Sequence, residues 1–397
     1  MKLNHFPLYR LGLTYFLIQL QFWFPIWVIF LLDKGLTFTD IIIADMLYWG
    51  MIVVLEVPMG YIGDRIGRKK TYFFGAILGA FTFLMMILIT EFYLLLICWV
   101  CWSFFLTIIS GTDTAYIYEL IKDEKLLERS NTIFGYFAAI TSLSFITSHF
   151  FASMLYSVNI NLPILVNALC VLAAGILIIT LPNPKKEPDD FLIPKMKEVI
   201  IDIAWKNKPI RILIFVLALL YAYSWSTTLI FQPFLLDLGV SIEFFGIVYL
   251  TFTSLGVIGG LITGKLVQWI GSYYLIIFGT FGMWVAIGLS GFSPSLYALI
   301  GIIFIRFFYF LSESPLKVLI NDDIDNKYRA SIFSLSNLIS SLMLLLLRPL
   351  MGFFSDIIGT RSSFQIWFFL GIMVFIISAY LIGTIVKELR IKLENPS

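Results

Sequence analysis

Seven ionisable side chains lie inside long apolar stretches of this 397-residue sequence, where a charge is costly. An acid in such a place can take up and release a proton. An arginine keeps its charge and needs water, a carboxylate or an anionic ligand. At the centre of a membrane helix such a side chain costs about 2.5 to 3.5 kcal/mol on insertion scales, so each is a candidate functional residue. The seven are Asp45, Glu56, Asp113, His149, Arg306, Glu313 and Arg348.

Arg306, Glu313 and Asp113 form the first candidate site. Glu313 follows Arg306 by two helical turns, so the two face the same side of one helix. Two carboxyls facing each other near an arginine could bind a cation or exchange protons. The alternative is a static charge cluster that holds helices together. The expected substrate and proton cavity consists of Arg306, Glu313, Asp113, Gln19, Tyr221 and Trp225.

Membrane-spanning helices must position these residues. Only 13% of the chain is charged and 60% is hydrophobic, which excludes an ordinary soluble domain. The apolar runs are about 20 residues long, the length that crosses a hydrocarbon core. The predicted fold is therefore an all-α membrane protein. Its twelve spans are expected near residues 8–32, 39–61, 71–90, 92–118, 131–156, 162–182, 209–236, 242–270, 273–291, 295–320, 330–354 and 362–386.

The chain divides into two similar halves. We expect an N-terminal bundle over 1–182, a cytoplasmic linker over 183–208 and a C-terminal bundle over 209–397. Phe30-Leu-Leu-Asp-Lys-Gly matches Phe234-Leu-Leu-Asp-Leu-Gly, and a second near-equal offset aligns Asp113 with Glu313. Such duplication is typical of transporters whose halves rock around a central site.

The loop after the second span carries a motif. It reads Gly60-Tyr-Ile-Gly-Asp-Arg-Ile-Gly-Arg-Lys-Lys, with Asp64 and Arg65 at its centre. This resembles the G-x-x-x-D-R-x-G-R-[KR] signature of the major facilitator superfamily. The resemblance implies two six-helix bundles related by a pseudo-two-fold axis, and a latch on the cytoplasmic side. The gate motif is then formed by Gly60, Asp64, Arg65, Gly67, Arg68 and Glu119.

The second copy of the motif is degraded, with Gln268 and Trp269 where the aspartate and arginine would stand. Asp45 and Arg348 lie towards the outer ends of the second and eleventh spans. Those spans are neighbours across the domain interface in the resembled family. We therefore expect Asp45 and Arg348 to pair as a periplasmic gate when the outer side is closed.

The leading hypothesis is a secondary active transporter that works by alternating access and exports a small amphipathic compound in exchange for protons. Asp113, Glu313 or His149 would carry the proton. A proton symporter or uniporter for a small metabolite, anionic and held by Arg306, is the alternative. A third hypothesis, from a different functional class, is a membrane receptor that does not transport a solute.

The partners that we expect are the small solute, protons and the lipid bilayer. Basic residues gather in alternate loops, and only Lys34 and Arg361 fall in the others, so both termini are predicted in the cytoplasm and the protein in the cell membrane. The residues offer no catalytic set, metal-ligand cluster or cofactor motif. No enzyme activity, cofactor, metal or nucleic-acid partner is expected, and the protein is expected to be a monomer.

Overall fold

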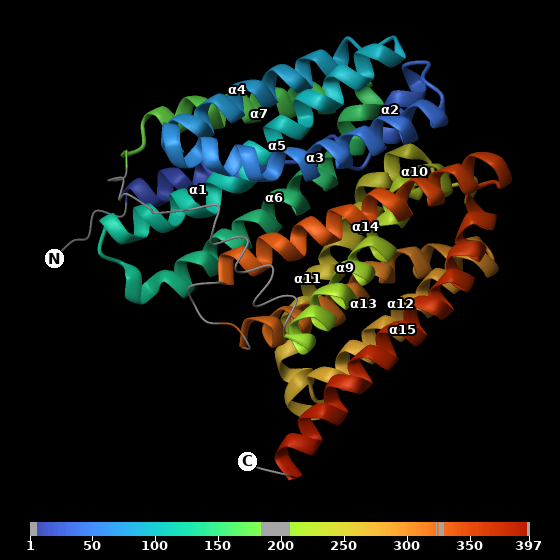
Figure 1. Ribbon diagram of the computed structural model, residues 1–397. Helices are drawn as coiled ribbons and strands as arrows, with labels where there is room; N and C mark the ends of the chain where they lie inside the picture. Colours follow the sequence, from blue (N-terminus) through green and yellow to red (C-terminus); the bar gives the residue numbers. More distant parts are fainter. Residues whose placement is uncertain (1–5, 184–206, 323, 325–328, 395–397) are drawn as a thin grey trace. The chain divides into compact units, whose positions relative to one another are not determined.

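The computed structural model describes residues 6–183, 207–322, 324 and 329–394, and within them it contains helices, turns and loops (Figure 1). Most of the expected linker over 183–208 lies outside these residues. The chain forms two compact units. Unit 1 comprises Met1–Pro188 and Ser241–Leu250, and unit 2 comprises Asp189–Val240 and Thr251–Ser397.

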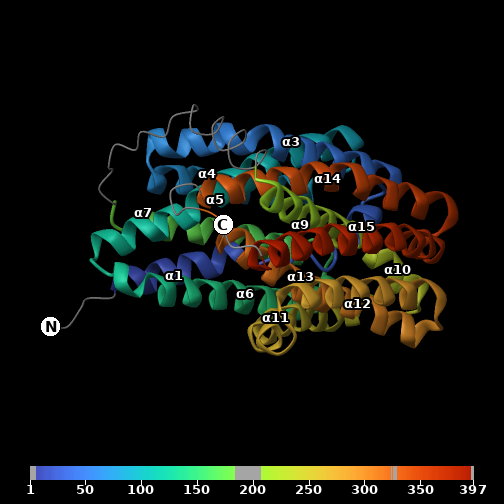
Figure 2. The ribbon, with the colours of Figure 1, turned by 60° about the horizontal axis from the view of Figure 1, so that its bottom comes forward.

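Unit 1 is built from long helices that pack along one another. Its helices are α1 (Phe6–Gln19), α2 (Trp27–Asp33), α3 (Phe38–Ile66), α4 (Arg68–Ile87), α5 (Phe92–Asp123), α6 (Ser130–Val158) and α7 (Leu162–Ile179), with the short turn η1 (Leu127–Arg129) before α6. Helix α5 packs on α3 and α4, and α4 also packs on α7. Helix α1 lies beside α6 in both ribbon views (Figure 2).

The segment Ser241–Leu250 joins unit 1 through α6. Ser153 on α6 donates to the carbonyl oxygen of Glu243 over 2.8 Å and accepts from the backbone N–H of Gly246 over 3.0 Å. A Cβ on Gly246 would lie 2.7 Å from the carbonyl oxygens of His149 and Phe150. Glycine is therefore required where these two backbones meet.

Unit 2 repeats the plan of unit 1. Its elements are α9 (Lys208–Ser226), η3 (Thr227–Leu229), α10 (Phe231–Asp237), most of α11 (Phe245–Ile270), α12 (Ser272–Phe292), α13 (Ser295–Asp322), α14 (Arg329–Ile358) and α15 (Thr360–Glu394), while η4 (Ile242–Phe244) belongs to unit 1. Helix α12 packs on α13 and α15, and α9 packs on α14 and α13. These contacts place α9 beside the two helices that carry Arg306 and Arg348.

The first and seventh expected spans are broken, which the sequence analysis did not predict. Helix α1 ends at Gln19 and α2 begins at Trp27, because Pro25 has no N–H for a helical hydrogen bond and its ring clashes with the preceding turn. The backbone N–H of Phe22, freed by the break, donates to Asn167 Oδ1 over 2.9 Å. The seventh span is interrupted by η3, which lies between α9 and α10.

Eleven helices of the described residues are long and apolar enough to cross a membrane. The twelfth expected span is the first one, which is absent from this set because α1 and α2 are each too short. The prediction of a continuous helix over 8–32 is therefore wrong in detail, although α1 and α2 together occupy that stretch.

The structure displays the internal repeat in its turns. Gly35 (φ +89°) follows α2 and Gly239 (φ +79°) follows α10. In both places the next N–H reaches back five residues, from Leu36 to Leu31 and from Val240 to Leu235. Only glycine adopts this left-handed conformation without strain, so the sequence match of the two halves is a match of helix ends.

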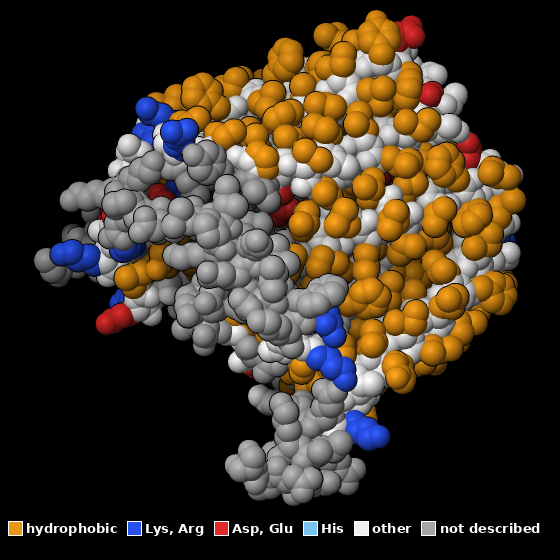
Figure 3. Space-filling model, in the orientation of Figure 1, with side chains coloured by type: hydrophobic (Ala, Val, Ile, Leu, Met, Phe, Trp, Pro, Cys, Tyr) orange, Lys and Arg blue, Asp and Glu red, His pale blue; other side chains and the backbone are white. Residues whose placement is uncertain are grey.

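The outer faces of both units are apolar. Exposed hydrophobic side chains recur every three or four residues along α4 and α15, which puts them on one stripe of each helix. They include Phe74, Ile77, Phe81 and Leu84 on α4, and Phe369, Met373, Ile376 and Tyr380 on α15. Hydrophobic side chains cover the middles of these helices and charged side chains stand at their ends (Figure 3). This pattern suits contact with lipid.

Candidate functional site

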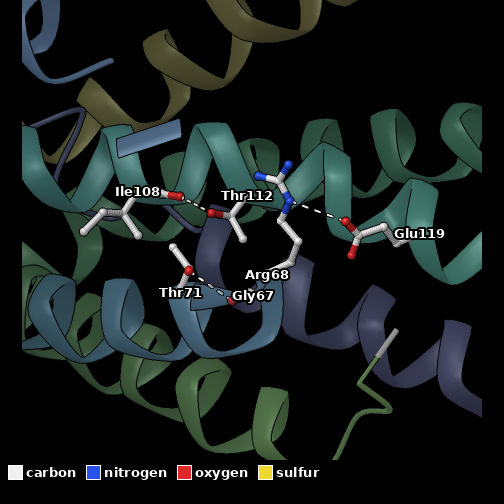
Figure 4. A network of polar contacts seen from close by, with 6 residues as sticks. All are labelled: Gly67, Arg68, Thr71, Ile108, Thr112 and Glu119. Atoms are coloured by element: carbon white, nitrogen blue, oxygen red, sulfur yellow. Dashed lines mark hydrogen bonds and ion pairs between the residues drawn. The ribbon is translucent and has the colours of Figure 1, made fainter. Parts of the chain in front are cut away.

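The gate motif folds into a tight corner between α3 and α4. Gly67, with φ +99°, ends α3 and begins α4, and its carbonyl oxygen accepts from Thr71 Oγ1 over 3.0 Å. Arg68, the first residue of α4, extends towards α5, where its Nε lies 3.5 Å from Glu119 Oε1 (Figure 4). A Cβ on Gly63 would lie 3.2 Å from Arg68 Nη1, so Gly63 leaves room for this side chain.

This ion pair joins Arg68 and Glu119, two residues of the expected gate motif. Arg65 is exposed in the last turn of α3. Gly60 and Asp64 also lie on α3, but their surroundings are outside the described part of the structure. The role of these three residues in a latch stays a prediction.

Two residues that the sequence analysis did not assign to the gate hold the end of α7. Lys69 Nζ donates to the carbonyl oxygen of Leu181 over 2.5 Å, and Tyr116 OH donates to that of Pro182 over 2.7 Å. These carbonyl groups lie just past the last turn of α7, where helical partners are missing. The corner of α3, α4 and α5 is thereby tied to the residues that follow α7.

Asp113 is the buried acid of unit 1. Its side chain, on α5, is 8% exposed and accepts from the backbone N–H of Thr114 over 2.5 Å and from Thr114 Oγ1 over 3.1 Å. The hydroxyl of Tyr15 interacts with Asp113 and with Gln19, which ends α1. Within the described residues, no lysine or arginine makes an ion pair with Asp113.

Arg306 is the corresponding cation of unit 2. It lies on α13, and its guanidinium carbon is 3.9 Å from the ring centroid of Trp225 on α9. The rings of Tyr309, Phe310 and Phe252 surround it at 5.5, 5.3 and 5.8 Å. The Nη1 atom is fully buried and has no hydrogen-bond partner among the described residues. Cation–π contacts thus replace the ion pair that a buried arginine usually makes.

Glu313 does not supply the missing ion pair. Its Oε1 lies 2.8 Å from Lys317 Nζ, one turn further along α13, and accepts from Tyr309 OH over 2.9 Å. The carboxylate is therefore neutralised on its own helix. The sequence analysis overlooked Lys317, although its spacing of four residues from Glu313 on a helix is a pattern that favours such pairs.

Arg348 holds the break in the seventh span. It lies on α14, is 5% exposed, and its Nη1 donates to the carbonyl oxygen of Trp225 over 2.7 Å and to Thr228 Oγ1 over 2.6 Å. Thr228 Oγ1 in turn donates to the same carbonyl oxygen over 2.7 Å. Trp225 is therefore fixed by Arg348 at its backbone and contacted by Arg306 at its ring.

The expected cavity residues thus form two groups. In unit 1, Asp113 lies near Gln19. In unit 2, Tyr221 contacts Trp225 and Tyr309, with ring centroids 5.8 and 6.4 Å apart, and so joins Arg306 to Glu313. The pairing of Asp113 with Glu313, and that of Asp45 with Arg348, would join residues of different units, and both stay predictions.

His149, the third candidate proton carrier, lies among aromatic rings. It is 2% exposed and stacks on Phe145 and Phe24, with centroid distances of 5.9 and 5.5 Å, while Tyr249 meets it edge-on at 6.0 Å. This packing places His149 in the aromatic core of unit 1. In the described ranges, no group of three or more His, Cys, Asp or Glu residues is placed to hold a metal ion.

The family model described as Major Facilitator Superfamily matches residues 11–347. The nucleoside transporter NupG has a similar solved structure, with a TM-score of 0.79, 13% identity, and coverage of 96% of this chain and 99% of that chain. A bacterial homolog of the human lysosomal transporter Spinster, in an inward-facing state, has a TM-score of 0.79 and 14% identity, and the match covers 98% of each chain. A bacterial homologue of the iron transporter ferroportin has a TM-score of 0.73 and 16% identity, and the match covers 97% of this chain and 99% of that chain. No curated protein matches the sequence.

Proposed function

Because that match covers most of its length, the chain belongs to the Major Facilitator Superfamily, and we propose that it exports a small amphipathic compound in exchange for protons. The fold of the family supports a secondary transporter that works by alternating access. The solved transporters that share the fold are described as carriers of solutes as different as nucleosides and iron, so the fold leaves the solute to local chemistry.

The position of Asp113 is the observation that supports proton coupling. Its carboxyl group is buried, and its hydrogen-bond donors among the described residues are uncharged: the hydroxyl and N–H of Thr114, the hydroxyl of Tyr15 and its own backbone N–H. A buried carboxylate without a cation is costly, and binding a proton removes the cost. A carboxyl group with these surroundings can alternate between its ionised and its protonated form as its access to water changes.

The surroundings of Glu313 favour a structural role for that residue. Lys317 and Tyr309 already stabilise its charged form, and Lys317 reaches towards solvent with 48% of its side chain exposed. A proton that bound to Glu313 would have to break this pair. Among the three carriers considered from the sequence, Asp113 is therefore the one that we assign.

We further propose that the protein lies in the cell membrane as a monomer, with both termini in the cytoplasm. Within unit 1, Arg68, Lys69 and Lys70 begin α4 at one end, whereas Glu91 and Asp40 lie at the opposite helix ends. Cytoplasmic loops carry an excess of Lys and Arg, which supports this orientation.

Proton flux into and out of liposomes tests the assignment of Asp113. Purified protein is reconstituted with an internal pH dye, and phenylacetate, phenethylamine and phenylethanol are added separately outside, with protein-free liposomes as the blank. We expect solute-evoked alkalinisation of the interior with the wild type, and its loss with Asp113→Asn. Asp123→Asn, an exposed change on the same helix, is the matched control and should behave as the wild type.

Solute-evoked proton flux that persists in Asp113→Asn would refute the role of Asp113. The sign of the flux separates the leading proposal from its rival, because an antiporter makes the interior more alkaline and a symporter makes it more acidic. Symport has its own support, since Arg306 offers an uncompensated positive charge and an anion moving with a proton carries no net charge. Acidification would favour the symporter.

A further inference from the structure

Arg306 is a cation that unit 2 leaves without a counter-charge. Its buried Nη1 has no acceptor among the described residues, and the acid on the same helix, Glu313, is engaged by Lys317 and Tyr309. Leaving a buried charge uncompensated costs several kcal/mol, so a residue in this state indicates a ligand that supplies acceptors.

The aromatic contacts determine which part of the guanidinium is available. The guanidinium carbon lies over the ring of Trp225, 3.9 Å from its centroid. The N–H groups of a guanidinium lie in its plane and form a fork that matches the two oxygens of a carboxylate. The contact with the ring of Trp225 leaves the N–H groups of this fork without acceptors, and Nη1 has none among the described residues. Arg306, Trp225 and Tyr221 are each partly exposed as residues, although Nη1 itself is buried.

The neighbouring helices are shaped around this side chain. A Cβ on Gly256 of α11 would lie 2.9 Å from Arg306 Cγ and 3.1 Å from the ring of Phe310. Glycine at this position therefore leaves the space that the aliphatic part of the Arg306 side chain occupies. The backbone that carries the ring of Trp225 is held in place, because Arg348 and Thr228 both donate to its carbonyl oxygen. The donor fork therefore has a fixed position, as a binding site requires.

The charge and the walls together define the ligand. One uncompensated positive charge matches one negative charge, and the rings of Phe252, Tyr309 and Phe310 match an apolar or aromatic body. The geometry points to Arg306 and Trp225 as the binding site for a monovalent organic carboxylate with an apolar or aromatic body. The inference rests on the proposed transport function and names the class of its solute.

Binding to the purified full-length protein, measured by titration calorimetry at one pH, tests this assignment. The probes are phenylacetate, benzoate and hexanoate, each compared with its amide. We expect at least one acid to bind ten times more tightly than its amide. Arg306→Gln should bring the acid down to the affinity of the amide, and Arg306→Lys, which keeps the charge but loses the fork, should give an intermediate affinity. Lys265→Gln, an exposed loss of charge in unit 2, should bind as the wild type does.

The result that overturns the inference is equal binding of acids and amides, binding of none of the acids, or acid binding that survives Arg306→Gln. Size-exclusion profiles and circular dichroism identify a variant that has lost its fold. If Arg306→Gln fails to fold, Trp225→Phe replaces it and should weaken the acid more than the amide, because the smaller ring no longer holds the fork. The assay uses no proton gradient, so a failure of proton coupling through Asp113 leaves its outcome unaffected.

Discussion

Arg348→Met should destabilise unit 2, because this arginine supports the broken seventh span. Methionine has a similar length and no donors, so the hydrogen bonds of Nη1 to Trp225 and Thr228 are lost. Hydrogen bonds to charged groups contribute about 1.5 to 3 kcal/mol each, but here both belong to one nitrogen and do not add. Removing the buried charge recovers part of its desolvation cost, and Thr228 still satisfies the carbonyl oxygen of Trp225.

The expected loss is therefore about 2 kcal/mol in the free energy of unfolding. Arg361→Met is the matched control, because Arg361 also donates to carbonyl oxygens, those of Gly291 and Ser293, but is exposed to water. It should lose less than about 1 kcal/mol. Denaturant titrations in detergent micelles, followed by tryptophan fluorescence, measure both. Equal losses, or no loss in Arg348→Met, would refute the reasoning.

Two further predictions concern packing and the gate motif. Gly279→Ala puts a methyl group 2.8 Å from the carbonyl oxygen of Phe308 and should cost about 1 to 3 kcal/mol of stability in the same titration. Gly383→Ala meets nothing within 4 Å and should be neutral, so equal effects of the two changes would contradict the packing argument. The Arg68–Glu119 pair is partly exposed, and a double-mutant cycle to glutamine should give a coupling below about 1 kcal/mol that falls with salt. A coupling that salt leaves unchanged would show that the pair is shielded from water.

Much of the fold could be read from the sequence, because its signals are local. Hydropathy marks the spans, and the repeated Gly35 and Gly239 mark equivalent helix ends. Pro25 is a local signal for the break after α1, but a hydropathy profile is averaged over about 19 residues and does not detect a single proline. What stabilises the break is the contact of Phe22 with Asn167, which lies 145 residues away and carries no local signal.

The candidate site was less accessible to sequence reasoning. The Glu313–Lys317 pair has helical spacing and could have been foreseen. The stacking of Arg306 on Trp225 depends on how α13 packs against α9, which the sequence does not encode in any short pattern. For the same reason, the ion pair of Arg68 with Glu119 needed the structure, since several basic residues follow one another in this motif.

The break between α1 and α2 also has a consequence for biosynthesis. The ribosome makes the chain from its N-terminus, so the N–H of Phe22 cannot meet Asn167 until 145 more residues have been translated. Until then, an unsatisfied N–H in lipid is costly, and a more continuous helix satisfies it better. The first span therefore enters the membrane early and reaches its final shape only after the sixth arrives. A nascent chain that ends before α7 should contain a first helix unlike that of the finished protein.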